Sequence, residues 1–319
     1  MYYDDIILDL ECDVGTNVTK AKWYSAFHFS LSSRTLCTQN IKKMSLKIGI
    51  IGGGQMSTAL TTGIVTSGLT PAANVSVSDI NKSSLDTLSA KVRGIKTTTN
   101  NAECITGVDV IIIAVKPQYA AACLAPLINV QSNQIVLSIM GGITLAQLTS
   151  MLKGKGKIVR AMPNTPALIG KGATGYCFTP GGNVTEKDAA IVEKVLSSVG
   201  TVVCIPESLI NTLTAVSGCG PAYVFMFIEA LADAGTRGGL PRATAQQLAA
   251  QTVMGSGALV LSSGQHPGQL KDNVCSPGGI TIEGVAALER LGFRGTVIQG
   301  CEAAARRADE MSRPPASKL

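Results

Sequence analysis

Residues 266–281, HPGQLKDNVCSPGGIT, place turn-forming and small polar residues directly ahead of a helical pattern. Within this stretch Pro277 stiffens a turn, the glycines at 278 and 279 allow close approach to the backbone, and Thr281 lies where the helix starts. Unpaired backbone N–H groups at a helix N-terminus hold a carboxylate well, and Ser276 adds a hydroxyl. These residue types in this order predict a site for a small anion.

A second candidate site is the glycine-rich turn in residues 48–57, IGIIGGGQMS. A β-rich run ends in three glycines and a helical pattern follows, which approximates the dinucleotide-binding pattern G-x-G-x-x-G/A. Gly52 would allow the tight turn, and Gly54 would let a pyrophosphate reach the helix N-terminus. Ser57 stands at the third position. The pattern predicts dinucleotide binding; the alternative is a glycine-rich turn that only packs tightly.

The type of dinucleotide depends on the end of the next strand-like run, VSVSD, where Asp79 follows Gly54 by 25 residues. A carboxylate at this place typically binds the ribose 2′-hydroxyl of NAD and disfavours a 2′-phosphate. Residues 81–84, Asn-Lys-Ser-Ser, would hold a 2′-phosphate if Asp79 turned away. The sequence therefore leaves NADH and NADPH both open.

A cation follows the strongest apolar run, VIIIAV at 110–115, in the form of Lys116, and Pro117 ends the strand. Ligands of Rossmann folds lie beyond the carboxyl ends of the strands. Lys116 is therefore predicted to lie near the cofactor phosphates or a substrate carboxylate. The alternative is a solvated lysine at the end of a strand.

The composition narrows the classes of protein and of site. Of 319 residues, 45% are hydrophobic and only 15% are charged, so another subunit is expected to cover part of the apolar surface. The net charge of +6 comes from scattered Lys and Arg, which does not suggest nucleic-acid binding. Nine cysteines without C-x-x-C spacing and two histidines predict no metal site. No uninterrupted apolar run has the length of a membrane span.

Two styles of sequence divide the chain. Residues 46–207 alternate β-rich runs with helical segments, which predicts parallel βαβ units and a Rossmann dinucleotide-binding domain. Residues 208–312 are helical and rich in Ala and Leu, which predicts a helical substrate and dimerisation domain. The expected fold class is an α/β Rossmann-type N-terminal domain followed by an all-α C-terminal dimerisation domain. The runs expected as strands are LKIGIIG, NVSVSD, VDVIIIAV, QIVLSIM, KIVRAMPN and GATGYCFT.

The two ends of the chain differ from its body. Residues 1–45 are interpreted as a poorly ordered extension, or as sequence upstream of the functional start, since Met44 stands just before the first strand. The functional alternative is a targeting arm. Residues 313–319 are expected to form a flexible tail, since two prolines stop the preceding helix. The last residues, Ser317-Lys318-Leu319, spell a peroxisomal import signal. They predict a peroxisome-type organelle; otherwise the protein is expected in the cytoplasm.

Six motifs occur in an order that resembles the pyrroline-5-carboxylate reductase family: IGGGQM (51–56), AVKP (114–117), MPNTP (162–166), SGCGPAY (217–223), GLPR (239–242) and HPGQLKDNVCSPGGIT (266–281). The resemblance covers residues 46–312. It implies hydride transfer from NADPH or NADH to the C=N carbon of 1-pyrroline-5-carboxylate, giving L-proline. It also implies an interlocked homodimer that assembles into a larger ring, with no nucleic-acid or membrane partner.

The resemblance also implies roles for individual positions. The chain departs from the family at Asp79, in the ribose-recognition loop, and at Cys219, where the family has serine. Cofactor contacts are implied for Ile51, Gly52, Gly53, Gly54, Gln55, Met56, Asp79, Asn101, Ala114, Val115, Lys116, Pro117, Met140, Gly141 and Gly142. Substrate contacts are implied for Glu207, Asn273, Ser276, Gly279, Ile280 and Thr281.

Thr281 is the predicted catalytic residue, as the group that hydrogen-bonds the ring nitrogen and relays a proton. The alternative is that Thr281 is simply a helix N-cap. His266 is interpreted as a structural histidine of a Pro-Gly loop rather than as an acid. Lys271 is expected either to attract the anionic substrate or to brace the loop through Asp272.

Two other functions compete with this one. A β-hydroxyacid-dehydrogenase-like oxidoreductase would need a catalytic lysine on a helix of the second domain, and residues 208–265 contain no lysine. A non-catalytic NAD(P)-binding regulator would not need residues 276–281, which the resemblance implies hold the substrate carboxylate.

Overall fold

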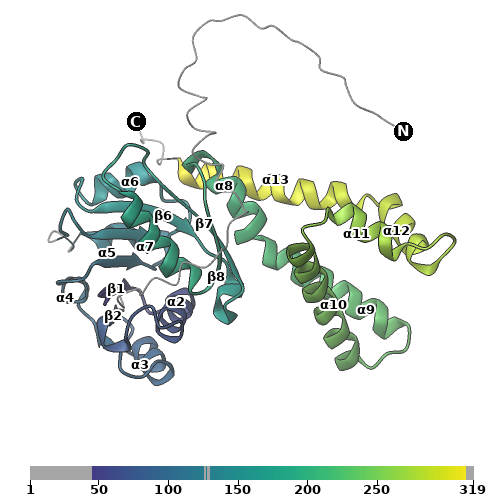
Figure 1. The fold of residues 1–319 in the computed structure, drawn as a ribbon, viewed down its shortest axis with the longest axis horizontal. Coiled ribbons are helices and arrows are strands. Elements are labelled where there is room, and N and C mark those ends of the chain that lie inside the picture. The colour runs from purple at the N-terminus through teal and green to yellow at the C-terminus, as the bar shows by residue number, and fades with distance from the viewer. Residues whose placement is uncertain (1–44, 126, 128–129, 314–319) are drawn as a thin grey trace, which may run out of the picture. The chain divides into compact units, whose positions relative to one another are not determined.

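The structure is a computed structural model that describes residues 45–125, 127 and 130–313 (Figure 1). The predicted N-terminal extension, except for Ser45, and the tripeptide Ser317-Lys318-Leu319 lie outside the described residues.

The first part of the described chain forms an eight-stranded sheet in the order β3-β2-β1-β4-β5-β6-β7-β8. Its central strands consist almost wholly of Ile and Val, which suits strands buried on both faces. The strands are β1 (Ile48–Ile51), β2 (Val75–Ser78), β3 (Lys96–Thr98), β4 (Val110–Ile113), β5 (Ile135–Ser138), β6 (Lys157–Met162), β7 (Gly172–Phe178) and β8 (Gly200–Cys204).

Helices cover both faces of this sheet, and successive strand residues alternate between two cores. Ile48 and Ile50 of β1 pack with α2 (Gln55–Thr66), α3 (Lys82–Lys91) and α7 (Glu186–Ser197). Ile51 packs in the opposite core with α5 (Ala120–Leu124), α6 (Leu145–Met151) and α8 (Ile210–Leu213). The predicted Rossmann-type architecture is thereby confirmed. Short elements complete it: η1 (Ala72–Asn74), α4 (Asn101–Cys104), η2 (Pro117–Tyr119), η3 (Thr165–Ile169) and η4 (Glu207–Leu209).

The prediction of parallel strands throughout residues 46–207 is wrong for the last two. β7 is antiparallel to β6, and β8 is parallel to β7. The connection from β6 to β7 contains only the short turn η3, whereas a parallel partner needs a crossover of about a dozen residues or more. The sequence pattern also did not predict β3 and β8, the two edge strands of the sheet.

One ion pair fixes α7 against β6 and makes stability depend on pH. Both carboxylate oxygens of Asp188 accept from Lys157 Nζ, at 2.9 and 2.8 Å, and Oδ2 also accepts from the Thr185 backbone at 2.8 Å. Burial alone would raise the pKa of Asp188, but these hydrogen bonds hold it below its usual value.

We therefore expect Asp188 to stabilise the fold fully above its unfolded pKa of about 3.8, and to lose this contribution as the pH falls through its lower folded pKa. Asp188→Asn should lower the free energy of unfolding near neutral pH and remove this part of the acid dependence. Urea titrations from pH 7 downward, with Glu186→Gln on the same helical turn as the control, measure both effects. A wild-type and an Asp188→Asn protein with parallel pH profiles would contradict the assignment.

The rest of the chain is helical, as predicted. The π-helical turn η5 (Thr214–Gly218) leads into α9 (Gly220–Arg237), which packs against α10 (Arg242–Ser263) through three buried alanines, Ala232, Ala245 and Ala249. The chain continues through α11 (Pro267–Val274), α12 (Ile280–Arg290) and α13 (Phe293–Ser312). α13 returns to α8, where Asn211 Nδ2 donates to Asp309 Oδ1 at 2.7 Å.

The prediction of a Pro-Gly loop after His266 is wrong, because residues 267–274 form α11. Pro267 occupies the first helical position, and His266 Nδ1 accepts from the Gly268 backbone at 3.1 Å as the N-cap. The helix is short and largely polar, so no apolar periodicity reveals it. His266 therefore has a structural contact, as predicted.

The continuous helical stretch Glu207–Arg237 is long and apolar enough to cross a membrane by length and composition alone, although the longest uninterrupted apolar run did not predict a span. The core helix of a soluble protein has the same length and composition. The exposed side chains of Val224, Phe225 and Met226 place this apolar surface on α9.

Candidate active site

The glycine turn has the backbone that a dinucleotide site requires. Gly52 has a φ of +104°, and a Cβ there would lie 2.6 Å from the Ala114 carbonyl oxygen, so only glycine fits. Gly54 is the N-cap of α2, where no side chain caps the helix and a Cβ would meet no atom within 4 Å. The first turn of α2 is therefore open to an anion. Ser57 is fully buried, and its Oγ has no hydrogen-bond partner among the described residues.

A cleft of about 630 Å³ opens beside this turn. Eight of the residues predicted to bind cofactor line it: Ile51, Gly52, Gly54, Asp79, Asn101, Ala114, Val115 and Lys116. Seven do not: Gly53, Gln55, Met56, Pro117, Met140, Gly141 and Gly142. Sequence reasoning missed the remaining lining residues, Ser78, Ile80, Thr99, Asn100, Tyr119, Ala122 and Cys123.

Four of the seven missed residues lie at the carboxyl ends of β2 and β3, and these ends of parallel strands share one edge of a sheet. They are Ser78, Ile80, Thr99 and Asn100. Recognising β3 would have placed Thr99 and Asn100 at this edge. Ser78 Oγ donates to Asn101 Oδ1 at 2.8 Å, which fixes the Asn101 amide at the cleft. The pKa of the Cys123 thiol is raised by burial and then by the charge of Asp79, so this thiol stays protonated at neutral pH.

Asp79 bonds the glycine turn itself. Its Oδ2 accepts from the Gly53 backbone at 2.6 Å, and its Oδ1 accepts from the Asn81 backbone at 2.8 Å. The carboxylate thus joins the end of β2 to the middle of the turn while remaining in the cleft lining.

Residues 140–142 lie between the sheet and α13. Met140 is buried, and its backbone donates to Ser138 Oγ at 3.3 Å. Gly142 has a φ of +77°, and a Cβ there would lie 3.5 Å from Met311 Cβ. This loop leads directly into α6, whose N-cap Thr144 forms a capping box with Gln147.

The predicted anion-binding segment, residues 276–281, is called the elbow below. It ends in a helix N-terminus, as the sequence indicated. α12 begins at Ile280 with Gly279 as its N-cap, no side chain caps it, and Gly278 has a φ of +63°. A Cβ on Gly279 would lie 2.2 Å from Ser276 Oγ, so this hydroxyl packs against the N-cap residue of α12. The alternative reading of Thr281 as the N-cap is wrong, because Thr281 is the second residue of the helix.

The other predicted substrate residues differ in their surroundings. Ile280 is 95% exposed, and Asn273 Oδ1 accepts from Gln269 Nε2 at 3.0 Å on α11. Glu207 lies at the start of the helical part, where its Oε1 accepts from the Leu145 backbone at 2.7 Å and from Arg160 at 3.0 Å. Lys271 pairs with Asp272 at 2.8 Å, which is the bracing contact predicted for it.

Two of the motifs contact each other through one asparagine. Asn164 of MPNTP donates to the Ser217 carbonyl at 3.0 Å, and its Oδ1 accepts from the Ala173 backbone at 2.9 Å. Cys219 follows Ser217 in SGCGPAY, at the start of α9. The pKa of the neighbouring Tyr223 hydroxyl is raised by burial and then by the nearby Cys219 and Cys301 thiols.

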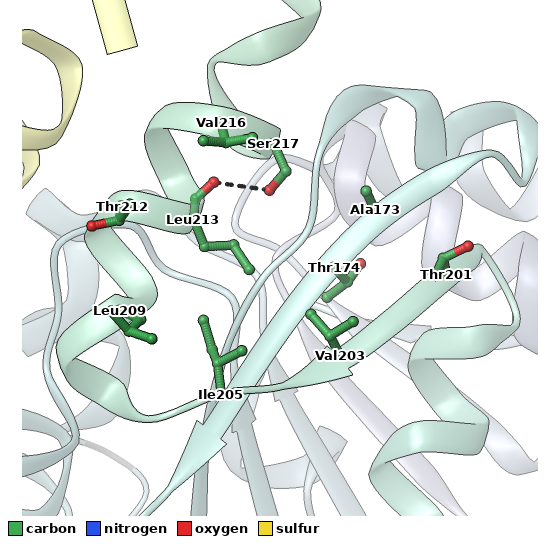
Figure 2. A pocket seen from close by; sticks show the side chains of 10 residues that line it. All are labelled: Ala173, Thr174, Thr201, Val203, Ile205, Leu209, Thr212, Leu213, Val216 and Ser217. Carbon is green, nitrogen blue, oxygen red and sulfur yellow. Dashed lines mark hydrogen bonds between the residues drawn. The ribbon is translucent and has the colours of Figure 1, made fainter. Parts of the chain in front are cut away.

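A second cavity, of about 400 Å³, lies between β7, β8 and the α8–η5 turn. Figure 2 shows Leu213, Ile205 and Val203 pointing into it, with Ser217 Oγ bonded to the Leu213 carbonyl at 3.0 Å. Its described lining carries no charged group, so it offers no acid, base or anion-binding cation.

The structure does not join the elbow to the dinucleotide cleft within one chain, as judged from the described lining of the cleft, which ends at Cys123. Both sites are helix N-termini without a side-chain cap, so the glycine turn suits a pyrophosphate and the elbow suits a carboxylate.

The chain is similar to known proteins whose names agree with one another. The family model "Pyrroline-5-carboxylate reductase dimerisation" matches residues 207–311, and "NADP oxidoreductase coenzyme F420-dependent" matches residues 47–142. The chain is 40% identical to pyrroline-5-carboxylate reductase of Methanosarcina acetivorans over 84% of this chain and 98% of the relative. The crystal structure of Plasmodium falciparum pyrroline carboxylate reductase with NADP bound has a TM-score of 0.75 at 37% identity, covering 84% of this chain and 98% of that one. The enzyme from Coxiella burnetii gives a TM-score of 0.79 at 33% identity, covering 85% and 100%.

Proposed function

The chain belongs to the pyrroline-5-carboxylate reductase family, and on this premise we propose that it reduces 1-pyrroline-5-carboxylate to L-proline with NAD(P)H, the last step of proline biosynthesis. The observation that carries the proposal is the uncapped N-terminus of α12, where Ser276 Oγ lies over Gly279. This elbow suits a substrate that offers one carboxylate and little apolar area.

The residues around the glycine turn fit a nicotinamide dinucleotide. Gly52 packs the turn tightly against Ala114, Gly54 leaves open space for the pyrophosphate, and the open first turn of α2 favours its negative charge. When bound, the cofactor supplies the hydride that reduces the imine carbon. Lys116 and Asn101 line the same cleft and would contact the bound dinucleotide.

The chain's own residues bind and orient the substrate. We propose that Ser276 and the backbone N–H groups at Ile280 and Thr281 hold the carboxylate, with Asn273 beside them. The Gly279 N–H donates to the Ser276 carbonyl at 3.0 Å, so Gly279 shapes the turn around the carboxylate. The Thr281 hydroxyl donates a hydrogen bond to the ring nitrogen. As a proton passes to the nitrogen, the hydroxyl regains one from solvent water, so it relays a solvent proton that makes the imine carbon more electrophilic. Most of the rate enhancement then comes from positioning rather than from a strong acid.

The active site is proposed to form between subunits, with the elbow of one chain facing the cleft of another. The dimerisation region at residues 207–311 supports an oligomer, and the exposed apolar residues of α9 supply its contact surface. We further propose that the dimers assemble into a larger ring. Light scattering of the purified protein measures the mass of the particle and so tests this. Domain boundaries at residues 46–207 and 208–312 complete the proposed organisation.

Reduction is tested by following NAD(P)H absorbance with 1-pyrroline-5-carboxylate as the sole added substrate and identifying the product by mass spectrometry. We expect the absorbance to fall and proline to accumulate in equal amounts. Constant absorbance with bound cofactor would instead support the non-catalytic regulator. Turnover of β-hydroxy acids with oxidised cofactor would support the dehydrogenase-like alternative, against which stands the lack of lysine in residues 208–265.

We propose that the protein is imported into a peroxisome-type organelle if Ser317-Lys318-Leu319 acts as an import signal. Otherwise we propose that it is in the cytoplasm. Microscopy of a fluorescent fusion at the N-terminal end, with and without the tripeptide, separates the two. Identical diffuse signals would leave only the cytoplasmic proposal.

A further inference from the structure

We infer that Asp79 makes this chain prefer NADH over NADPH, which goes beyond the proposed function but rests on it. The inference starts from the position of the carboxylate. Asp79 follows β2 directly, where the adenosine ribose of a Rossmann dinucleotide lies, and it belongs to the lining of the cleft. A 2′-phosphate bound there would meet a negative charge.

The carboxylate is held in this position by two short hydrogen bonds. Its oxygens accept from the Gly53 and Asn81 backbones at 2.6 and 2.8 Å. A Cβ on Gly53 would lie 3.3 Å from both Cβ and Oδ2 of Asp79, so the glycine turn packs closely against the carboxylate. Turning Asp79 away, as binding of a 2′-phosphate would require, breaks both bonds and leaves the Gly53 N–H without this acceptor.

The loop that would receive a 2′-phosphate has already paired several of its donors. The Asn81 N–H bonds Asp79, the Ser83 N–H bonds the Asn81 side chain at 3.0 Å, and the Ser84 N–H bonds the Asn81 carbonyl at 3.1 Å. These bonds start α3 and exist only with the loop in its present conformation. The loop therefore offers a phosphate fewer N–H groups than its Asn-Lys-Ser-Ser sequence suggests.

Cations near this position are few. In the described lining of the cleft the sole cation is Lys116, which follows β4, on the opposite side of β1 from β2. Lys82 begins α3 and is exposed, but it is not part of that lining. A phosphate monoester carries nearly two negative charges. With no cation beside Asp79 in the described lining of the cleft, the repulsion of this phosphate by Asp79 is expected to weaken NADPH binding relative to NADH about tenfold.

The test measures binding before catalysis. Dissociation constants of NADH and NADPH for the full-length protein come from nicotinamide fluorescence without substrate. We expect wild type to bind NADH about tenfold more tightly than NADPH, and the preference to shrink as added salt screens the repulsion. Asp79→Asn removes the charge and keeps an acceptor for Gly53, so it should bring the two constants to within about threefold. Asp86→Asn, an exposed carboxylate on α3, is the matched control and should leave the ratio unchanged.

Three results would overturn the inference: equal or tighter binding of NADPH by wild type, an unchanged ratio in Asp79→Asn, or a selective loss of NADPH affinity in Lys82→Ala. The wild-type ratio needs no variant, so it decides even if Asp79→Asn fails to fold. Reduction of 1-pyrroline-5-carboxylate with a preference for NADPH would refute this inference and leave the proposed function intact. Tighter binding of NADH without any reduction would support this inference and refute the proposed function.

Discussion

Replacing Thr281 with alanine is expected to lower kcat for 1-pyrroline-5-carboxylate about a hundredfold, the lower end of what a positioned proton donor contributes. The hydroxyl is the proposed partner of the ring nitrogen, and alanine leaves that nitrogen without a donor. Cofactor affinity should stay within about twofold, because Thr281 is absent from the described lining of the dinucleotide cleft. Steady-state kinetics, together with fluorescence titration of the cofactor, measure both quantities.

Thr281→Ser is the matched control for this prediction. Serine keeps the hydroxyl at the second position of α12 and should retain most of the activity. Alanine is also a good helix former, so thermal melts of both variants should resemble wild type. A loss of cofactor affinity as large as the loss of turnover would disprove the catalytic role of Thr281.

The second large effect is expected at the contact between the sheet and the helical part of the chain. The Arg160 side chain is only 4% exposed, and it donates to Glu207 at 3.0 Å and to Asn211 at 3.3 Å. Glu207→Ala would leave this guanidinium buried without its carboxylate. We expect a loss of about 3 kcal/mol in the free energy of unfolding. The value lies at the lower end for broken buried pairs because the Glu207 side chain is 34% exposed.

Guanidinium denaturation measures this loss. Glu207→Gln keeps an oxygen for the Leu145 N–H and Arg160, so it should be destabilised by about half as much or less. Because Glu207 bonds the first residue of α6, the alanine variant should also loosen the preceding loop of residues 140–142. If Glu207→Ala unfolds at the same denaturant concentration as wild type, this bond has no structural importance.

Local patterns predicted the parts of the site that a short segment determines by itself. The glycine turn and the α12 elbow are both defined by glycines within six residues of a helix start, so their backbone geometry could be inferred from sequence. α11 was missed because a short polar helix lacks apolar periodicity. The reversal of β7 was missed because the strand pattern of GATGYCF carries no direction; the length of the preceding connection does.

The contacts between distant segments could not be predicted. The bond from Asp79 to Gly53 spans 26 residues, and that from Glu207 to Leu145 spans 62. Both use a carboxylate on a backbone N–H, which almost any nearby acidic residue can provide. The role of Glu207 at the start of α6 therefore follows only from three-dimensional structure, whereas the resemblance suggested a substrate contact.

The small alanine core of Ala232, Ala245 and Ala249 has a consequence for the living cell. Helices that bury so little within their own chain gain much of their stabilisation from a neighbouring copy, so the folded fraction follows mass action. Newly made subunits at low abundance would expose Phe225 and Met226 to chaperones and proteases before they bind a partner subunit. Halving the rate of synthesis would then reduce the amount of working enzyme by more than half.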